Sequence, residues 1–343
     1  MSYDMTKTYA IIFGTRPEYL KLKPIIHEFY KSNKKYKIIY ITQHAKIEEE
    51  IPDETEILPI VNTDKNRLSQ IGSDILTKLP NYILDCTDIM VQGDTTTAFY
   101  CALTAYQLQK RIIHIEAGLR TYDLENPFPE EANRQMISRI AMIHFTPHED
   151  CVAILKKEKV SGQIYNVGNT ILDLIQSYNL TCNMQNIVII TFHRRENWNK
   201  IDELLIGLQK LVKKTPHIKY IWYLHPNPEL QEKVKRMIQS IPMIEIKNPC
   251  NHLEFTKQMA ACNFLITDSG GIQEEASYLG KHCIVLRSST ERNHIAKKYI
   301  TVLKNYSLLS EIYEEIPKSP LIPCNVYGYG DSSKKIMEIL SES

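Results

Sequence analysis

Short apolar runs alternate with amphipathic stretches along almost the whole chain. In the first half, the apolar runs predict strands at 9–13, 37–42, 89–91, 111–115 and 140–145. In the second half, they predict strands at 187–192, 220–224, 243–246, 264–267, 282–286 and 300–303. Between the strands, apolar residues recur at helical spacing, as in Leu204, Leu208 and Leu211. Such alternation is typical of α/β proteins with parallel sheets, in which a ligand binds at the carboxyl ends of the strands.

The polar segment 177–185 interrupts this pattern, and we place a domain junction there. A length of 343 residues suits two domains, each with its own core. The stretch 316–330, rich in Pro, Gly and Tyr, predicts a loop before one terminal helix at 332–340. The sequence thus predicts two doubly wound parallel-sheet domains that face each other across a cleft.

Composition narrows the class of partner. The chain is 24% charged and 43% hydrophobic, with a formal net charge of +1, which argues against nucleic acid or a membrane surface as the main partner. Its eight Cys are scattered without a C-x-x-C pair, so we expect neither a disulfide framework nor a zinc site. The sequence contains no signal-peptide segment and no run of membrane-spanning length, and we expect a soluble, cytoplasmic protein.

The segment TDSGGIQEEA, residues 267–276, predicts a strand, a tight glycine turn and a helix. Such a turn directs the N–H groups of Ser269, Gly270 and Gly271 towards an anion at the positive end of the helix dipole. The glycines allow a phosphate to approach the backbone closely. Glu275, one helical turn later, can accept hydrogen bonds from a diol such as a ribose. The alternative is the ordinary packing of an α/β turn.

Two further turns follow strands in the first half. In FGTRPEYLKLKP, residues 13–24, Arg16 and Lys21 flank the crevice and can neutralise a diphosphate. The alternative is that both are solvated helix residues. In MVQGDTTTAF, residues 90–99, Asp94 is either a carboxylate at the floor of the crevice or simply a helix N-cap.

Acidic residues also end one strand and begin one helix in the segment 114–139. Glu116 ends an apolar strand, where an unpaired carboxylate is costly unless it faces a polar cleft. Glu130 and Glu131 begin a helix, which the dipole favours in any case, and Arg134 is expected to pair with one of them. Asp94, Glu116 and Glu130, if close together, would raise at least one pKa and suit proton transfer to and from carbon.

The second half carries two more polar segments after strands. In TFHRRENW, residues 191–198, His193 stands where a diphosphate can accept its N–H, although a lone His is more often structural. In RSSTERNHI, residues 287–295, Thr290, Glu291 and Arg292 are offered to the same crevice. His225 closes a further strand, and its role stays open.

Taken in order, these segments resemble the UDP-N-acetylglucosamine 2-epimerase family, of the non-hydrolysing bacterial type. The shared motifs are FGTRPE, GDTTT, HIEAGLRT, PFPEEANR, HRREN, TDSGGIQEEA and TERN, and they run from about residue 10 to 329. The resemblance implies a GT-B-like fold of two Rossmann-like domains, 1–176 and 177–324. It also implies that the terminal helix, within 325–343, crosses back to the first domain.

The resemblance further implies a mechanism that interconverts UDP-GlcNAc and UDP-ManNAc. The proton on carbon 2 is removed, UDP leaves carbon 1, and the resulting 2-acetamidoglucal takes UDP back with protonation on the opposite face. No cofactor and no metal take part. The implied acid–base carboxylates are Asp94, Glu116 and Glu130, and His193 is implied to stabilise the departing phosphate. The residues implied to bind UDP are Arg16, Lys21, Cys250, Phe255, Ser269, Gly270, Gly271, Glu275 and Arg292.

Some family features are altered in this chain. Members often bind a second UDP-N-acetylglucosamine as an activator, through a Gln-His-Arg run, a helix Arg and a His. Gln43, His44 and His225 remain, but Ala45 and Asp74 stand where the arginines are expected. We therefore expect the activator site to be weakened or lost. The change also leaves room for a different 2-acetamido sugar, such as a 6-deoxy one.

Alternative activities stay open at this point. A hydrolysing 2-epimerase, which releases UDP and free sugar, shares the elimination step, although the GDTTT and EAGLR forms favour the non-hydrolysing type. A GT-B glycosyltransferase would share the nucleotide-binding half without needing the three carboxylates, and a nucleotide-sugar sensor would not need them either. The resemblance implies a homodimer with a UDP-sugar as its ligand.

Overall fold

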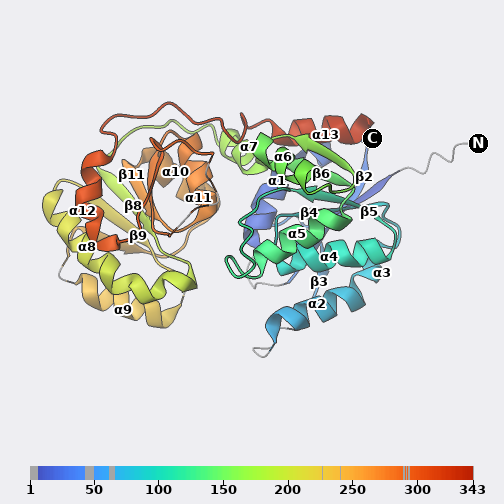
Figure 1. Cartoon of the computed structure of the whole chain (residues 1–343), viewed down its shortest axis with the longest axis horizontal. Helices are drawn as coiled ribbons and strands as arrows, with labels where there is room; N and C mark the ends of the chain where they lie inside the picture. The colour runs from blue at the N-terminus through green and yellow to red at the C-terminus, as the bar shows by residue number, and fades with distance from the viewer. Residues whose placement is uncertain are drawn as a thin grey trace, which may run out of the picture. The chain divides into compact units, whose positions relative to one another are not determined.

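The computed structural model describes residues 7–42, 50–61, 66–225, 227–239, 241–288, 290, 292 and 294–342. It forms two compact units. Unit 1 comprises Met1–Leu174 and Tyr327–Ser343, and unit 2 comprises Ile175–Val326. Figure 1 labels the helices and strands of both units.

The core of unit 1 is a parallel sheet of seven strands in the order β3-β2-β1-β4-β5-β6-β7 (Figure 1). The strands are β1 (Thr8–Phe13), β2 (Lys35–Ile41), β3 (Glu56–Leu58), β4 (Asp88–Gln92), β5 (Arg111–Ile115), β6 (Ile143–Thr146) and β7 (Gln163–Asn166). The helices are α1 (Arg16–Lys31), α2 (Arg67–Lys78), α3 (Pro80–Ile83), α4 (Thr96–Gln107), α5 (Glu130–Ile140), α6 (Glu149–Lys157), α7 (Thr170–Ser177, which runs into unit 2) and α13 (Ser332–Glu342).

Both faces of this sheet are buried, which explains why its central strands are continuously apolar. Along β1, Tyr9, Ile11 and Phe13 belong to the core that includes residues of α1 and α13. Ala10 and Ile12 point to the opposite core, which includes residues of α2, α4 and α5. The alternation follows from the two-residue period of a strand.

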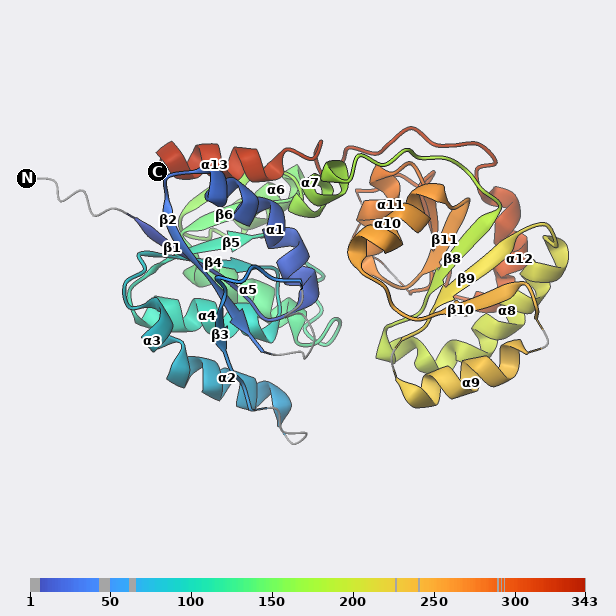
Figure 2. The same cartoon turned by 180° about the vertical axis from the view of Figure 1, so that it is seen from behind.

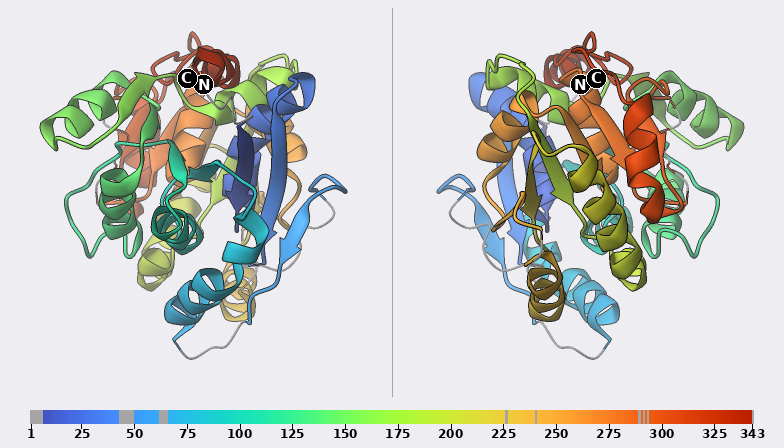
Figure 3. Two further views of the ribbon diagram at one scale, coloured as in Figure 1. Left: turned by 90° about the vertical axis from the view of Figure 1, so that its right-hand side faces the viewer. Right: turned by 90° about the vertical axis from the view of Figure 1, so that its left-hand side faces the viewer.

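Helix α13 returns to unit 1 and packs against α1, as Figures 2 and 3 show in dark red and blue. The Lys34 ammonium donates to the carbonyl of Leu340, 306 residues along the chain, at 3.1 Å. Asp173 in α7 accepts the first N–H groups of the helix, from Ser332 at 3.1 Å and from Ser333 at 2.6 Å. The predicted return of the terminal helix to the first domain is therefore observed within unit 1.

Unit 2 holds a parallel sheet of six strands in the order β10-β9-β8-β11-β12-β13. The strands are β8 (Ile187–Thr191), β9 (Lys219–Tyr223), β10 (Ile244–Lys247), β11 (Phe264–Thr267), β12 (His282–Val285) and β13 (Ile300–Val302). The α-helices are α8 (Ile201–Lys214), α9 (Pro228–Ile238), α10 (His252–Ala261), α11 (Gly270–Tyr278) and α12 (Leu309–Ile312). Short 3-10 helices span Arg195–Lys200, Tyr306–Leu308 and Tyr313–Glu315.

The predicted fold class, two parallel-sheet α/β domains, is confirmed. Every predicted strand has an observed counterpart, but β3 and β7 were not predicted. The strand expected at 140–145 begins only at Ile143, because Ile140 is still the last residue of α5 and Ala141 caps that helix by donating to Ile137. Among the described residues, no helix is both long enough and apolar enough to cross a bilayer.

The cap of α13 leads to a prediction about stability. Asp173→Ala would leave the buried N–H groups of Ser332 and Ser333 without an acceptor, at a cost of about 1–3 kcal/mol in free energy of unfolding. Urea denaturation followed by circular dichroism measures this loss. Asp331→Asn is the matched control, because Asp331 directly precedes the helix and forms an exposed pair with Lys335. This substitution should cost at most about 0.5 kcal/mol. Equal losses in the two variants would contradict the proposed cap.

Candidate functional site

Three turns of unit 1 lie side by side at the carboxyl edge of its sheet. They follow β1, β4 and β5, which are neighbours in the sheet. The strand order reverses between β1 and β4, because β2 lies on one side of β1 and β4 on the other. In open parallel sheets this switch point is where ligands bind. The three turns carry Arg16, Asp94 and Glu116.

Glu116, which follows β5, is surrounded by donors. Its backbone adopts a left-handed conformation with φ of 65°. The Lys21 ammonium donates to both carboxylate oxygens, at 2.7 and 2.6 Å. The amides of Gln92 and Asn169 donate to one oxygen each, at 2.5 and 3.2 Å. A single carboxylate thus joins α1, β4 and the start of α7, and the observed partner of Lys21 is an acid of the same unit.

Asp94 lies on the turn next to that of Glu116 and pairs with a different cation. The Arg134 guanidinium donates to Asp94 Oδ2 from Nε and lies at 2.7 Å from it through Nη2 as well. A Cβ on Gly93, the preceding residue, would meet Glu116 Oε2 at 3.5 Å, so the two acidic turns are in contact. The N-cap of α4 is Thr95, whose hydroxyl accepts from the Ala98 N–H. The alternative in which Asp94 itself caps the helix is therefore wrong.

The two acids at the start of α5 differ in their surroundings. Glu131 is fully buried and accepts from the backbone N–H groups of Thr121 and Tyr122 and from Arg134 at 3.1 Å. Burial by itself raises the pKa of Glu131, but the hydrogen bonds outweigh burial and leave the pKa lowered. Glu130 is half-buried at the first position of the helix. The predicted pairing of Arg134 with one of these acids is confirmed, and the acid is Glu131.

Helix α5 also places Glu130 near the Asp94 turn. Asn133, one helical turn after Glu130, donates from its amide to the Asp94 carbonyl at 2.9 Å. The first two turns of α5 therefore border the turn that carries Asp94. Arg16, at the start of α1, pairs with Glu50 at 3.0 Å, and both side chains are about one third exposed.

Unit 2 has its own switch point, between the adjacent strands β8 and β11. Thr191 and Thr267, at the ends of these strands, share a buried hydrogen bond of 2.7 Å. Asp268, fully buried, accepts from the backbone N–H groups of His193 at 3.0 Å and Arg194 at 2.8 Å. It also accepts from the Asn197 amide at 3.2 Å. Asp268 thus fixes the loop that carries His193, a role that the sequence did not indicate.

The ring of His193 is oriented by a carbonyl. Its Nε2 lies 3.1 Å from the carbonyl oxygen of Tyr223. A carbonyl can only accept, so Nε2 carries the hydrogen in this arrangement. Nδ1 is then the ring nitrogen left for a ligand.

The glycine turn before α11 differs in one respect from the expectation. Ser269 is the N-cap of α11, but its N–H donates to the Thr267 hydroxyl at 3.1 Å and is not available to an anion. The helix begins at Gly270, so the N–H groups of Gly270 and Gly271 have no acceptor within the helix. The turn therefore offers an anion two glycine N–H groups rather than three.

Two side chains that the sequence assigned to UDP have partners in unit 2. Glu275 accepts from His252 Nε2 at 2.9 Å, and His252 Nδ1 lies 2.9 Å from the Tyr178 hydroxyl. Arg292 is buried and donates from Nε to Glu274 at 2.5 Å. These contacts fix the direction of each charged group, and sequence reasoning did not identify the partners Glu274 and His252.

Phe255 and Cys250 both contact Tyr223, the last residue of β9. The Phe255 ring meets Tyr223 edge-on, with ring centroids 5.2 Å apart. Both Phe255 and Cys250 are half-buried. Burial, followed by a contact with Cys250, raises the pKa of Tyr223 well above its usual value.

Part of the region compared with an activator site lies outside the described residues, namely Gln43, His44 and Ala45, as does Glu291. Asp74 is buried in α2 and accepts from the Val61 N–H at 2.8 Å. His225 Nδ1 accepts from the Asn227 N–H at 3.1 Å. The expected weakening of the activator site stays a prediction.

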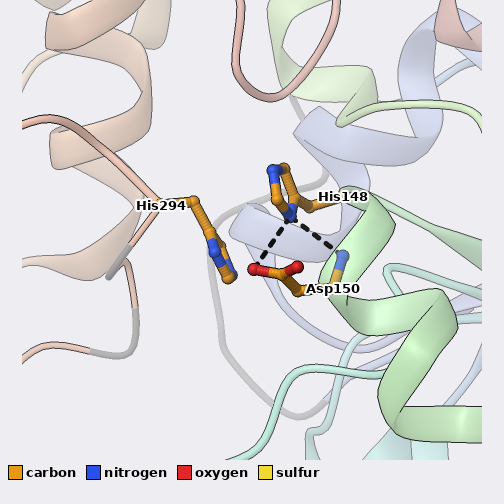
Figure 4. A group of neighbouring side chains, drawn as sticks. All are labelled: His148, Asp150 and His294. Carbon is orange, nitrogen blue, oxygen red and sulfur yellow. Dashed lines mark hydrogen bonds and ion pairs between the residues drawn. The ribbon is translucent and has the colours of Figure 1, made fainter.

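A His and an Asp of unit 1 lie together at the start of α6. His148 is its N-cap, and its Nδ1 accepts from the Asp150 N–H at 3.1 Å (Figure 4). The same nitrogen lies 3.7 Å from the Asp150 carboxylate. These contacts are those of a capped helix start.

Comparison with known proteins places this geometry in a family. The chain is 32% identical to the UDP-N-acetylglucosamine 2-epimerase of Neisseria meningitidis, over 96% of this chain and 98% of that protein. It superposes on the crystal structure of the Neisseria meningitidis enzyme bound to UDP-GlcNAc with a TM-score of 0.89 and 30% identity, over 98% of this chain and 100% of that one. For the Methanocaldococcus jannaschii enzyme in complex with UDP-GlcNAc and UDP, the TM-score is 0.84 at 29% identity, over 98% and 100% of the two chains.

The fold of these structures is GT-B-like, as the sequence predicted. The family model of UDP-N-acetylglucosamine 2-epimerase matches residues 27–341, which is most of the chain. Because the family model covers most of the chain and the Neisseria meningitidis relative is 32% identical to it, the chain belongs to the UDP-N-acetylglucosamine 2-epimerase family.

Proposed function

We propose that this protein is a non-hydrolysing epimerase that interconverts UDP-GlcNAc and UDP-ManNAc, or a related UDP-2-acetamido sugar. A base takes the proton on carbon 2, and the electron pair of that C–H bond forms the double bond of a 2-acetamidoglucal. The bond between carbon 1 and the phosphate oxygen breaks, and its electron pair leaves with UDP. UDP then adds back to carbon 1 while carbon 2 is protonated on the opposite face.

We assign proton transfer to the carboxylates of unit 1. Asp94, Glu116 and the helix start that carries Glu130 gather around the turns at the edge of its sheet. Two of these acids pair with different cations: Glu116 with Lys21, and Asp94 with Arg134, which also pairs with Glu131. Carboxylates on different turns suit a reaction that removes a proton from one face of a carbon and returns one to the other face.

We assign binding of UDP to unit 2. The N–H groups of Gly270 and Gly271 begin α11, where the helix dipole favours a phosphate. Arg292, held by Glu274, supplies positive charge, and Glu275, held by His252, supplies an acceptor for a ribose diol. In the neutral form of His193 only Nε2 carries a hydrogen, and it is bound to Tyr223, so stabilising the departing phosphate through Nδ1 requires protonation.

The single observation that carries the proposal is the gathering of Asp94, Glu116 and the start of α5 at one switch point, in a chain of this family. A GT-B glycosyltransferase does not need these acids. The relative from Neisseria meningitidis that is named a 2-epimerase supports the same conclusion.

We further propose that the protein acts in the cytoplasm as a homodimer and supplies a sugar for polysaccharide biosynthesis. This rests on the family resemblance alone. Light scattering of the purified chain tests the dimer, and a monomeric mass at micromolar concentration would exclude it.

Incubation with UDP-GlcNAc in deuterated water tests the function directly. We expect deuterium at carbon 2 of both UDP-sugars, because each turnover returns a solvent-derived proton to that carbon. NMR of the products measures it. Free sugar with UDP would show the hydrolysing reaction instead, and absence of exchange without an acceptor would favour a glycosyltransferase.

Asp94→Asn should lower turnover about 10²- to 10⁴-fold, the usual contribution of one acid–base group. The amide oxygen can still accept from Arg134, so the fold should be retained. Initial rates with UDP-GlcNAc measure the effect. Asp85→Asn, in the exposed turn that precedes the same strand, is the matched control and should keep full activity. Near-normal turnover of the Asp94 variant would remove this residue from the mechanism.

Arg292→Lys should weaken the affinity for UDP about tenfold, because Lys keeps the charge beside Glu274 but loses the planar fork that can bind phosphate. Calorimetry with UDP measures the affinity. Alanine is less informative here, because it would leave Glu274 buried without its cation. Arg236→Lys, in an exposed pair of α9, should bind UDP normally, and an unchanged Kd for the Arg292 variant would count against its role.

A further inference from the structure

One buried carboxyl joins the starts of two helices in unit 1. Glu18 is only 2% exposed. Its Oε2 accepts from the Thr15 hydroxyl at 2.7 Å and from the Gly14 N–H at 3.2 Å. Its Oε1 accepts from the Thr95 hydroxyl at 2.8 Å, across 77 residues of sequence. Thr15 and Thr95 are the N-caps of α1 and α4, so Glu18 ties both caps together.

Helix capping alone does not account for this arrangement. A Thr followed three residues later by Glu is a capping box, which explains the bond from the Glu18 N–H to the Thr15 hydroxyl. It explains neither the burial of the carboxyl nor the bond from Thr95. The two turns also touch directly, because a Cβ on Gly14 would lie 2.4 Å from the Thr97 hydroxyl oxygen. Glu18 therefore bridges the two turns at the switch point of the sheet.

The bridge ends at the residue next to Asp94. On the other side of Asp94, the carbonyl of Gly93 accepts from His114 Nε2 at 2.7 Å. Burial lowers the pKa of His114 to about 3, so this ring is a neutral donor. The backbone on both sides of Asp94 is thus held by buried side chains, His114 before it and Glu18, through Thr95, after it.

We propose that Glu18 is a positioning residue for the epimerisation step, because it fixes the turn from which Asp94 acts. This proposal rests on the proposed function, in which Asp94 transfers a proton. Glu18 does not itself touch the reacting atoms.

The protonation of Glu18 predicts a pH dependence that tests the proposal. Burial raises the pKa of Glu18 to about 7, against the opposing effect of its bonds to Thr15, Thr95 and Gly14. The titratable group that faces it from α4 is the Cys101 thiol, whose pKa is raised by burial and by Glu18. Each threonine hydroxyl accepts a hydrogen bond from a helix N–H and donates one to the Glu18 carboxylate. A proton on Glu18 would face one of these hydroxyl protons and loosen the bridge.

The active form is therefore the ionised one, and its population falls as pH drops through about 7. In Glu18→Gln we expect kcat to fall about ten- to hundredfold, the effect of a small misplacement of a catalytic group, while KM changes little. The rise of kcat with pH near 7 should also disappear. A variant with normal kcat that keeps this rise would overturn the proposal.

Two further variants separate positioning from stability. Ile25→Val removes one methylene from the buried face of the same helix, and we expect a modest loss of stability with normal kcat. Thr95→Val breaks the bridge from its other end, so the double variant with Glu18→Gln should lose little more activity than either single variant. Fully additive losses, or a loss in Ile25→Val as large as in Glu18→Gln, would overturn the proposal.

Amide hydrogen exchange tests the bridge independently of enzyme activity. Wild-type turnover is measured first, and its absence would refute the proposed function, not the bridge. Mass spectrometry then compares amide exchange over residues 93–98 in the wild type, Glu18→Gln and Ile25→Val. Faster exchange in Glu18→Gln alone supports the bridge, and unchanged exchange in that variant overturns it.

Discussion

At the carboxyl edge of a parallel sheet, the backbone groups of the turns need hydrogen-bond partners that the strands do not supply. Neighbouring strands end together there, and the backbone groups just beyond them are buried without ladder partners. In both units, one buried carboxylate accepts hydrogen bonds from these turns at the point where the strand order reverses. Glu18 collects donors from the turns after β1 and β4, and Asp268 collects donors from the loop after β8. The turns that these two carboxylates hold in place carry the candidate functional residues Asp94 and His193.

The sequence predicted the sheets well because their central strands are buried on both faces. The strands at 111–115 and 264–267 were predicted to the residue, since both are short, mainly apolar runs in which every residue but Arg111 is buried. The missed strands lie at the two edges of the sheet of unit 1, where β7 has only exposed and half-buried residues and β3 has three residues. Strands of this kind lack the continuous apolar signal on which the prediction depends.

The candidate site was predicted more unevenly than the fold. A polar side chain directly after an apolar strand is visible in the sequence, and this signal found Asp94, Glu116 and His193. Their partners are not visible, because Lys21 and Glu116 are 95 positions apart and Asp268 and His193 are 75 positions apart. Only the folded chain brings them together. The identity of the reaction came from the resemblance, since carboxylates at strand ends suit several chemistries.

Unit 1 is assembled from two stretches of chain that unit 2 separates. Its face around Phe29 is covered by Ile336 and Leu340 of α13, which leave the ribosome only after all of unit 2 has been made. Domains generally fold in the order in which they are synthesised, but here the later one can close its core first. During translation, this apolar face of unit 1 therefore stays uncovered until α13 has been made, and chaperones bind exposed apolar surface of this kind on nascent chains.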